Sequence, residues 1–292
     1  MSDILFVGHC TKDVITINNE TSYLPGGGVY FGAVSAGYCL KAHPSDKDIK
    51  LIVLTIGKKE DYVKVQHEMD ACGAKLILIE DDKTTTFVHS FEDNNPDKRI
   101  SSVTDIARSF TWDDVKNYKA KFCYVNPLFF GEVDPSLFKL LHQNCEYVSC
   151  DAQGLLRHQK DGKVYLKAPE NIPAVLDGID ILKVDAGEAT ALTGIKDDTR
   201  KACLQLLSYG PRWVICTQSD YVELHTKESV ISSKFGQWSL AGRTGRGDTV
   251  SAAFILEHFL AEVDAQKSLD IAATATGKKM MHPGAAVLAD YQ

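Results

Sequence analysis

The stretch Thr244-Gly245-Arg246-Gly247-Asp248 leads directly into a helical pattern over residues 249–260. Gly245 and Gly247 have no Cβ, so their backbone can approach a ligand closely and adopt positive φ. The first N–H groups of a helix have no intrahelical partner, and the helix dipole favours negative charge beside them. This stretch therefore predicts an anion-binding site at a helix N-terminus.

Asp248 is the unexpected residue of this stretch, because a carboxylate repels a phosphate held beside it. It fits if the carboxylate accepts a proton from a hydroxyl group while the helix end stabilises a transferring phosphoryl group. Asp is also a favoured helix N-cap that Gly often precedes, and taken alone this pattern is more often a capped turn. The rest of the chain has to decide between these interpretations.

Length, composition and charge limit the classes of protein to which the chain can belong. The chain has 292 residues, 44% hydrophobic and 24% charged, as in an ordinary globular protein, and it carries a net charge of −7. This charge argues against a general nucleic-acid or anionic-membrane surface. The eight cysteines form no Cys-x-x-Cys pair, and the N-terminus does not resemble a signal peptide, so we expect buried free thiols in the cytoplasm.

Short apolar runs alternate with helical patterns along most of the chain, which predicts a mostly parallel sheet with helices on both faces. Two segments interrupt this rhythm with β-branched and aromatic alternation, near residues 13–24 and 84–103. We expect them to form two hairpins of a small lid beside the main sheet. No internal repeat or long linker is visible, which indicates one domain over residues 1–292.

Several familiar sites are missing from the sequence. It contains no Walker-type G-x-x-x-x-G-K-[ST], no G-x-G-x-x-G after the first strand, no H-E-x-x-H and no G-x-S-x-G. The histidines show no metal-ligand spacing.

Four motifs together resemble the ribokinase-like (PfkB) carbohydrate kinases over essentially the whole chain. Gly8 with Asp13 resembles the first-strand motif, Gly26-Gly27 the first signature, residues 185–188 the N-x-x-E motif, and residues 244–249 the second signature, T-G-A-G-D-[TS]. The resemblance implies a three-layer α/β/α fold with a β lid. It also implies transfer of the γ-phosphoryl group of ATP to a hydroxyl of a sugar, polyol or nucleoside.

The resemblance also implies roles for particular residues. Asp248 would be the general base, with backbone N–H groups of Gly245, Arg246 and Gly247 as the anion hole, and Asp13 would bind hydroxyl groups of the acceptor. The remaining assignments are substrate contacts by Gly27, Gly28, Phe31, Phe87, Gln153 and Arg157; cofactor contacts by Thr217, Ser219, Thr244 and Gly277; and Mg²⁺ held, through water, by Asp185 and Glu188. The alternative interpretation of Glu188 is an acid in the first turn of a helix, favoured by the helix dipole.

The chain departs from the family pattern at several positions. Asp185 replaces the usual Asn, Phe31 aligns with the Asn of the first signature, and Arg246 replaces Ala. Gly242 aligns with an acid that helps to bind a monovalent cation in some members, so potassium activation is doubtful. The nucleotide base is expected near residues 217–220 and 273–277.

Three stretches resemble myo-inositol kinase-type members: residues 24–28 with Phe31, residues 85–91 with Arg99, and residues 151–157. This resemblance indicates a neutral polyol or sugar as acceptor. The alternatives are a nucleoside kinase, with Phe31, Phe87 or Phe91 stacking on a base, and a catalytically silent sugar- or nucleotide-binding protein. The expected partners are therefore small molecules, in a monomer or a homodimer.

Overall fold

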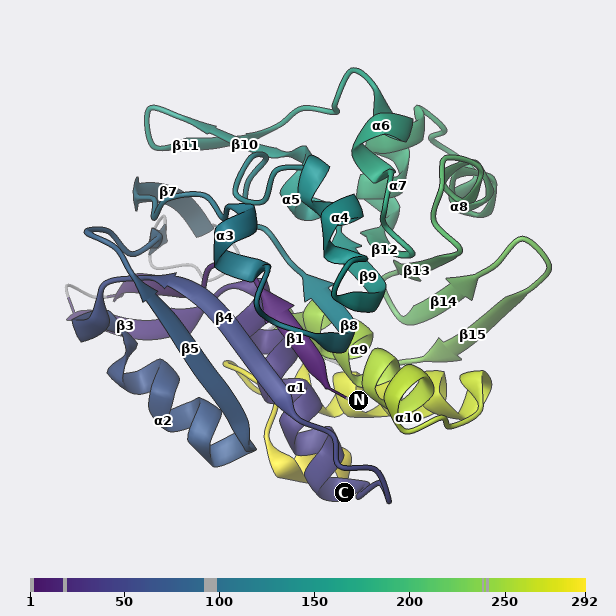
Figure 1. Cartoon of the computed structure of the whole chain (residues 1–292), viewed down its shortest axis with the longest axis horizontal. Helices are drawn as coiled ribbons and strands as arrows, with labels where there is room; N and C mark the ends of the chain where they lie inside the picture. Colours follow the sequence, from purple (N-terminus) through teal and green to yellow (C-terminus); the bar gives the residue numbers. More distant parts are fainter. Residues whose placement is uncertain (1–2, 18–19, 92–98, 238, 240–241) are drawn as a thin grey trace.

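The structure, a computed structural model, describes residues 3–17, 20–91, 99–237, 239 and 242–292. Residues 18–19 and 92–98, within the two expected hairpins, lie outside this part of the chain. Two sheets organise the molecule (Figure 1).

The larger sheet has nine strands in the order β15-β14-β13-β12-β9-β8-β1-β4-β5. All neighbours pair in parallel except β13-β14 and β14-β15, which are antiparallel. The strands are β1 (Ile4–Val7), β4 (Leu51–Gly57), β5 (Ala74–Glu80), β8 (Ala120–Val125), β9 (Cys145–Asp151), β12 (Ile181–Asp185), β13 (Trp213–Thr217), β14 (Tyr221–His225) and β15 (Val230–Lys234). This mostly parallel sheet with helices confirms the predicted α/β class.

Helices cover both faces of the larger sheet, and each face has its own hydrophobic core. One core involves α1 (Gly28–Ala42), α2 (Val63–Cys72), α9 (Arg246–Ile255), the π-helix η4 (Leu256–Leu260), α10 (Ala265–Lys279) and the 3₁₀ turns η1 (Lys59–Tyr62) and η5 (Leu288–Tyr291). The other involves α3 (Trp112–Val115), α4 (Ser136–Leu141), α5 (Gln153–Leu156), α6 (Ile172–Leu176), α7 (Ala186–Thr193) and α8 (Thr199–Ser208). None of the described helices is long and apolar enough to cross a membrane.

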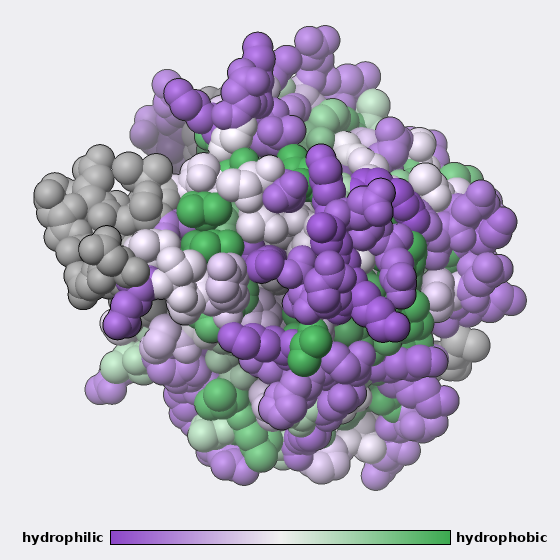
Figure 2. Space-filling model, turned by 90° about the vertical axis from the view of Figure 1, so that its left-hand side faces the viewer, coloured by the Kyte–Doolittle hydropathy of each residue, from purple (hydrophilic) through white to green (hydrophobic). Residues whose placement is uncertain are grey.

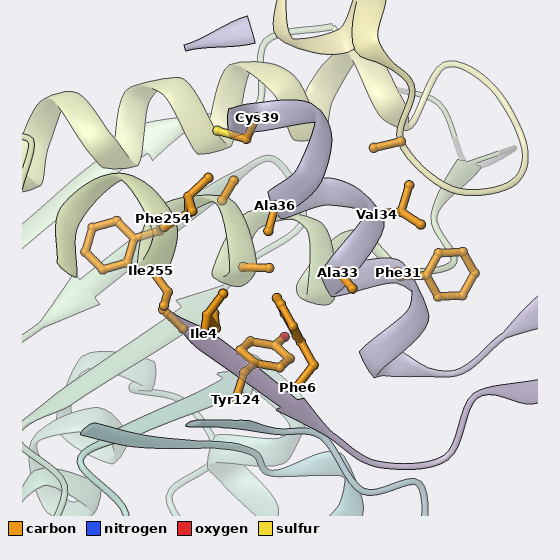
Figure 3. Close-up of a cluster of buried hydrophobic side chains, with 14 of the residues drawn as sticks. Ile4, Phe6, Phe31, Ala33, Val34, Ala36, Cys39, Tyr124, Phe254 and Ile255 are labelled. Carbon is orange, nitrogen blue, oxygen red and sulfur yellow. The ribbon is translucent and has the colours of Figure 1, made fainter. Parts of the chain in front are cut away.

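Helix α1 packs closely on α9 because its contact face is built from small residues. Ala33 and Ala36 are fully buried, and a Cβ on Gly32 would lie 3.5 Å from the Cβ of Ala252 on α9. Figure 3 shows this seam above the side chains of Phe6 and Tyr124, whose ring centroids are 5.2 Å apart. The N-termini of the two helices are thereby held side by side.

The smaller sheet has six strands in the order β10-β11-β7-β6-β2-β3. They are β2 (Thr11–Ile17), β3 (Glu20–Gly26), β6 (Thr86–Phe91), β7 (Arg99–Asp105), β10 (Arg157–Lys160) and β11 (Lys163–Leu166). The predicted segments correspond to β2-β3 and β6-β7, and the same sheet contains a further hairpin, β10-β11. The β10-β11 hairpin was not predicted because β10 is polar and β11 has three consecutive apolar residues, so neither strand shows an apolar alternation. The surface on this side of the molecule is mainly hydrophilic with small apolar patches (Figure 2).

Candidate active site

A cavity of about 850 Å³ lies between the two sheets, at the end of the larger sheet where α1, α7 and α9 begin. Its lining includes Asp13, Gly27, Gly28, Phe31, Phe87, Gln153, Arg157, Asp185, Glu188, Thr217, Ser219, Thr244, Gly245, Arg246, Gly247 and Asp248. All of these residues were expected at the site from the sequence. The structure brings residues from opposite ends of the chain to one cavity.

Asp248 lies in the first turn of α9 and faces Asn126, which follows β8. Asn126 Nδ2 donates a hydrogen bond of 2.6 Å to Asp248 Oδ1. Burial raises the pKa of Asp248 from 3.8 to about 6, with Asp151 adding to the rise, while Lys183 and Asn126 oppose it. A carboxylate with this pKa is largely ionised at neutral pH and close enough to it to accept a proton.

Lys183 on β12 links the carboxylates of the site. Its Nζ lies 3.0 Å from Asp151 Oδ2 and 3.6 Å from Glu188 Oε2, and its pKa is raised well above the usual value by these and neighbouring acids, against the opposing effect of burial. A Cβ on Gly247 would lie 2.5 Å from Lys183 Cε, so the lysine lies directly against the start of α9. Its positive charge is therefore placed beside the predicted anion site.

Asp185 and Glu188 form a reciprocal capping box at the start of α7. Asp185 Oδ1 accepts from the Glu188 N–H, and Glu188 Oε2 accepts from the Asp185 N–H, each at 2.7 Å. The two side chains therefore cap α7, and both also line the cavity. Burial raises the pKa of Glu188 to about 7, despite Lys183. A buried carboxylate whose charge is incompletely balanced is a fitting neighbour for a hydrated Mg²⁺ ion.

The loop before α9 turns through Gly245, whose φ of 79° is accessible to glycine at little cost. Its Cα packs on the Phe31 ring, because a Cβ there would lie 2.6 Å from Phe31 Cγ. From behind, Lys279 Nζ donates to the carbonyl oxygens of Gly242, at 2.6 Å, and Thr244. Burial lowers the pKa of Lys279 to about 8. This buried ammonium group therefore holds in place the loop that precedes α9.

On the smaller sheet, Asp13 is held by neighbouring polar groups. Thr11 Oγ1 donates to Asp13 Oδ1 at 2.7 Å, and His89 Nε2 lies 3.5 Å from Asp13 Oδ2. The His89 ring stacks against Phe87, with 6.1 Å between ring centroids. An oriented carboxylate beside aromatic rings suits a ligand with several hydroxyl groups and apolar C–H faces.

Only some of the residues expected near the nucleotide base line the cavity. Thr217 and Ser219 line the cavity, and Arg246 spans that end, with Nη1 donating to Ser219 O at 3.4 Å and the guanidinium 5.8 Å from the Phe235 ring. Gly277, however, is buried in α10 outside the cavity lining. A Cβ on Gly277 would lie 1.7 Å from Phe235 O, and Gly277 is not among the residues that line the cavity, so its expected contact with a cofactor stays a prediction. Phe235 and Gln237, which follow β15, occupy the space beside Gly277.

Sequence reasoning missed Asn126, Lys183, Lys279 and His89. Lys183 stands two residues before the acidic pair 185–188, at the carboxyl end of a predicted strand, which is a signal that could have identified it. Asn126 also follows a predicted strand. His89 lies within residues 85–91, which resemble myo-inositol kinase-type members, but nothing in the sequence marks it individually. Lys279 carries no site pattern, and the packing of α10 places it against the loop before α9.

Comparison with known proteins gives a consistent family. No family model and no curated protein matched the sequence. Among solved structures, a pyrophosphate-dependent kinase of the ribokinase family, complexed with a pyrophosphate analog and myo-inositol, superposes with a TM-score of 0.86. It is 30% identical, and the match covers 98% of both chains.

Two further structures agree in fold. A pyrophosphate-dependent myo-inositol-1 kinase, converted into a myo-inositol-3 kinase by two substitutions, has a TM-score of 0.85 at 30% identity, covering 98% of this chain and 96% of its own. Ribokinase from Arabidopsis thaliana, complexed with ribose and ATP, has a TM-score of 0.72 at 18% identity, covering 98% and 94%. The latter similarity bears on the fold alone.

Proposed function

The chain belongs to the ribokinase family, a family of phosphotransferases that act on alcohol groups, and from that premise we propose that it transfers a phosphoryl group from inorganic pyrophosphate to a hydroxyl group of a neutral, inositol-like polyol. The observation that carries the kinase proposal is the cavity that joins Asp13 to the α9 N-terminus and Asp248. Acceptor-binding and phosphoryl-stabilising groups thus share one space.

In the proposed reaction, Asp13 accepts hydrogen bonds from acceptor hydroxyl groups and so orients the sugar-like ring. Asp248 takes the proton of the attacking hydroxyl. The new O–P bond forms as the bridging P–O bond of the donor breaks, and the leaving phosphate carries away that electron pair. Backbone N–H groups of Gly245, Arg246 and Gly247 stabilise the charge on the transferring group.

Pyrophosphate is favoured over ATP by the shape of the donor end. The family resemblance places a nucleotide base against residues 273–277, but Ala273 and Thr276 are fully buried, and Gly277 packs on the Phe235 carbonyl. Arg246, where the family usually has Ala, lines the same end of the cavity and offers a cation for a second phosphate. The 30%-identical structures described as pyrophosphate-dependent support the same donor.

Kinases of this kind use Mg²⁺ to neutralise donor charge. Asp185 and Glu188 would hold the ion through its water ligands, while Lys183 balances the remaining acidic charge of the site. The eight cysteines, all buried free thiols, fit a reducing compartment such as the cytoplasm.

The test is a matrix of donors and acceptors: pyrophosphate or ATP, each with Mg²⁺, against myo-inositol, ribose and a nucleoside. The phosphorylated product is followed by ³¹P NMR, so that simple pyrophosphate hydrolysis is not counted. We expect product with pyrophosphate and myo-inositol, and a loss of about 10²–10⁴ in rate in Asp248→Asn. Asp197→Asn, at an exposed site, is the matched control.

Each other result has a defined meaning. Product with ATP but not with pyrophosphate would rule out pyrophosphate as the donor and leave the kinase proposal standing. Product with only the nucleoside would favour a nucleoside kinase. No phosphorylated product from any pair would reject the kinase proposal.

A further inference from the structure

Three potential metal ligands meet at the opposite end of α1 from the cavity. Cys39 lies on α1, His43 is the C-cap residue of that helix, and Glu257 lies on the π-helix η4. Cys39 Sγ is 3.2 Å from Glu257 Oε1 and 3.9 Å from His43 Nδ1, and His43 Nδ1 is 3.2 Å from Glu257 Oε1. Two side chains four residues apart at one helix end thus face a third from another helix.

These separations match one face of a small coordination tetrahedron. Around zinc, metal–sulfur bonds of about 2.3 Å and metal–nitrogen or metal–oxygen bonds of about 2.0–2.1 Å place neighbouring ligand atoms about 3.3–3.6 Å apart. The three observed separations lie within a few tenths of an ångström of that range. Sulfur, imidazole nitrogen and carboxylate oxygen are also the ligand types that zinc accepts.

The burial of these side chains and their access to solvent both suit a bound metal ion. Cys39 is fully buried and Glu257 is 3% exposed, so both side chains are held away from bulk water. A second cavity, of about 570 Å³, is lined by His43 and Glu257 and opens the cluster toward solvent. A metal with three protein ligands needs such an opening for a water molecule in the fourth position.

We propose that Cys39, His43 and Glu257 bind a zinc-type divalent cation, with a water from the second cavity as fourth ligand. The Cys39 thiol loses its proton to solvent as the sulfur–metal bond forms, and neutral His43 contributes the lone pair of Nδ1. The metal ties the end of α1 to η4, the continuation of α9. Because α1 and α9 begin at the active-site cavity, the site stabilises the pair of helices that carries Gly28 and Asp248.

The test uses the full chain without a histidine tag. Cobalt(II) is added first, because a thiolate-to-cobalt charge-transfer band reports sulfur ligation directly, and Zn²⁺ is then titrated against it. We expect the band in the parent chain, its loss when one equivalent of Zn²⁺ is added, and a zinc-dependent rise in Tm. Cys39→Ser should lose both signals, whereas Cys72→Ser, at another buried cysteine of the same core, should keep them.

His43→Gln guards against a variant that fails to fold, since the His43 side chain is 37% exposed. It should keep the parent secondary structure and weaken zinc affinity by about tenfold or more. No charge-transfer band in the parent chain, or an equal zinc-dependent rise in Tm in Cys39→Ser, would overturn the site. Neither result depends on which donor or acceptor the enzyme uses.

Discussion

Asn126 Nδ2 donates a hydrogen bond of 2.6 Å to Asp248 Oδ1, across 122 residues of sequence. Asn126 enters from the end of β8, in the middle of the larger sheet, and Asp248 from the first turn of α9. The amide therefore fixes one carboxylate oxygen of a side chain that lines the cavity. It also lowers the pKa of Asp248 against the effect of burial, so Asn126 is a positioning residue for the proposed base.

Asn126→Ala should raise the pKa of Asp248 above its value of about 6, because the hydrogen bond that favours the charged form is lost. The acidic limb of the kcat/KM profile should then move to higher pH, and kcat at neutral pH should fall about tenfold or more. A pH series with the parent enzyme and Asn144→Ala, whose side chain bonds to Lys116 O far from the cavity, measures this. An unmoved acidic limb would show that Asn126 does not tune the base.

Ionisation of Asp248 should oppose folding. Its pKa in the folded protein, about 6, is higher than its ordinary 3.8, so the folded state binds this proton more tightly than the unfolded state does. The resulting stabilisation is complete below about pH 4 and is lost as the pH rises through 6. Relative to the parent, Asp248→Asn should gain stability across this window, by at most about 3 kcal/mol at pH 7. Urea unfolding of both proteins at pH 4, 5, 6 and 7 gives the difference in their free energies of unfolding. A difference that is the same at all four pH values would contradict the prediction.

The sequence predicted best where local pattern and tertiary role coincide. The T-G-R-G-D stretch at residues 244–248 forms the expected helix start, and the parallel strands follow the apolar runs. The sequence could place Asn126 at the end of a strand, but it could not predict the hydrogen bond to Asp248, 122 residues away, or the contacts of Lys279, 35–37 residues away. For Gly277, the family pattern marks only a position in the sequence, whereas the path of the chain after β15 decides whether that position is open to a ligand.

Substitutions of Arg246 and Asp13 should affect the binding of different substrates. Arg246→Ala should raise the KM for pyrophosphate, and Asp13→Asn the KM for the polyol, each by about 10–100-fold, since hydrogen bonds to charged groups are worth about 1.5–3 kcal/mol. Steady-state kinetics with each substrate varied in turn measures the split. If both variants affect the same KM, the proposed orientation of the substrates is wrong.

Lys279 should make the enzyme independent of potassium. Its buried ammonium group already donates to the carbonyl oxygens of Gly242 and Thr244, behind the anion loop, and Gly242 supplies no carboxylate for a monovalent cation. Replacing potassium by tetramethylammonium should leave kcat unchanged. Lys279→Met should lower kcat by on the order of 100-fold through misplacement of the loop. A strong potassium requirement in the parent would contradict this role.

Gly277→Ala should destabilise the protein, because the added Cβ would lie 1.7 Å from the backbone oxygen of Phe235. Overpacking of this kind costs about 1–3 kcal/mol or more, since backbone must move to relieve it. Gly187→Ala is the matched helical control: its Cβ would approach nothing closer than Asp185 Oδ1, at 3.3 Å. Thermal or urea unfolding of the two variants decides the comparison. Full stability of Gly277→Ala would mean that the chain after β15 stands away from α10, which would reopen the space for a nucleotide base and return ATP as the favoured donor.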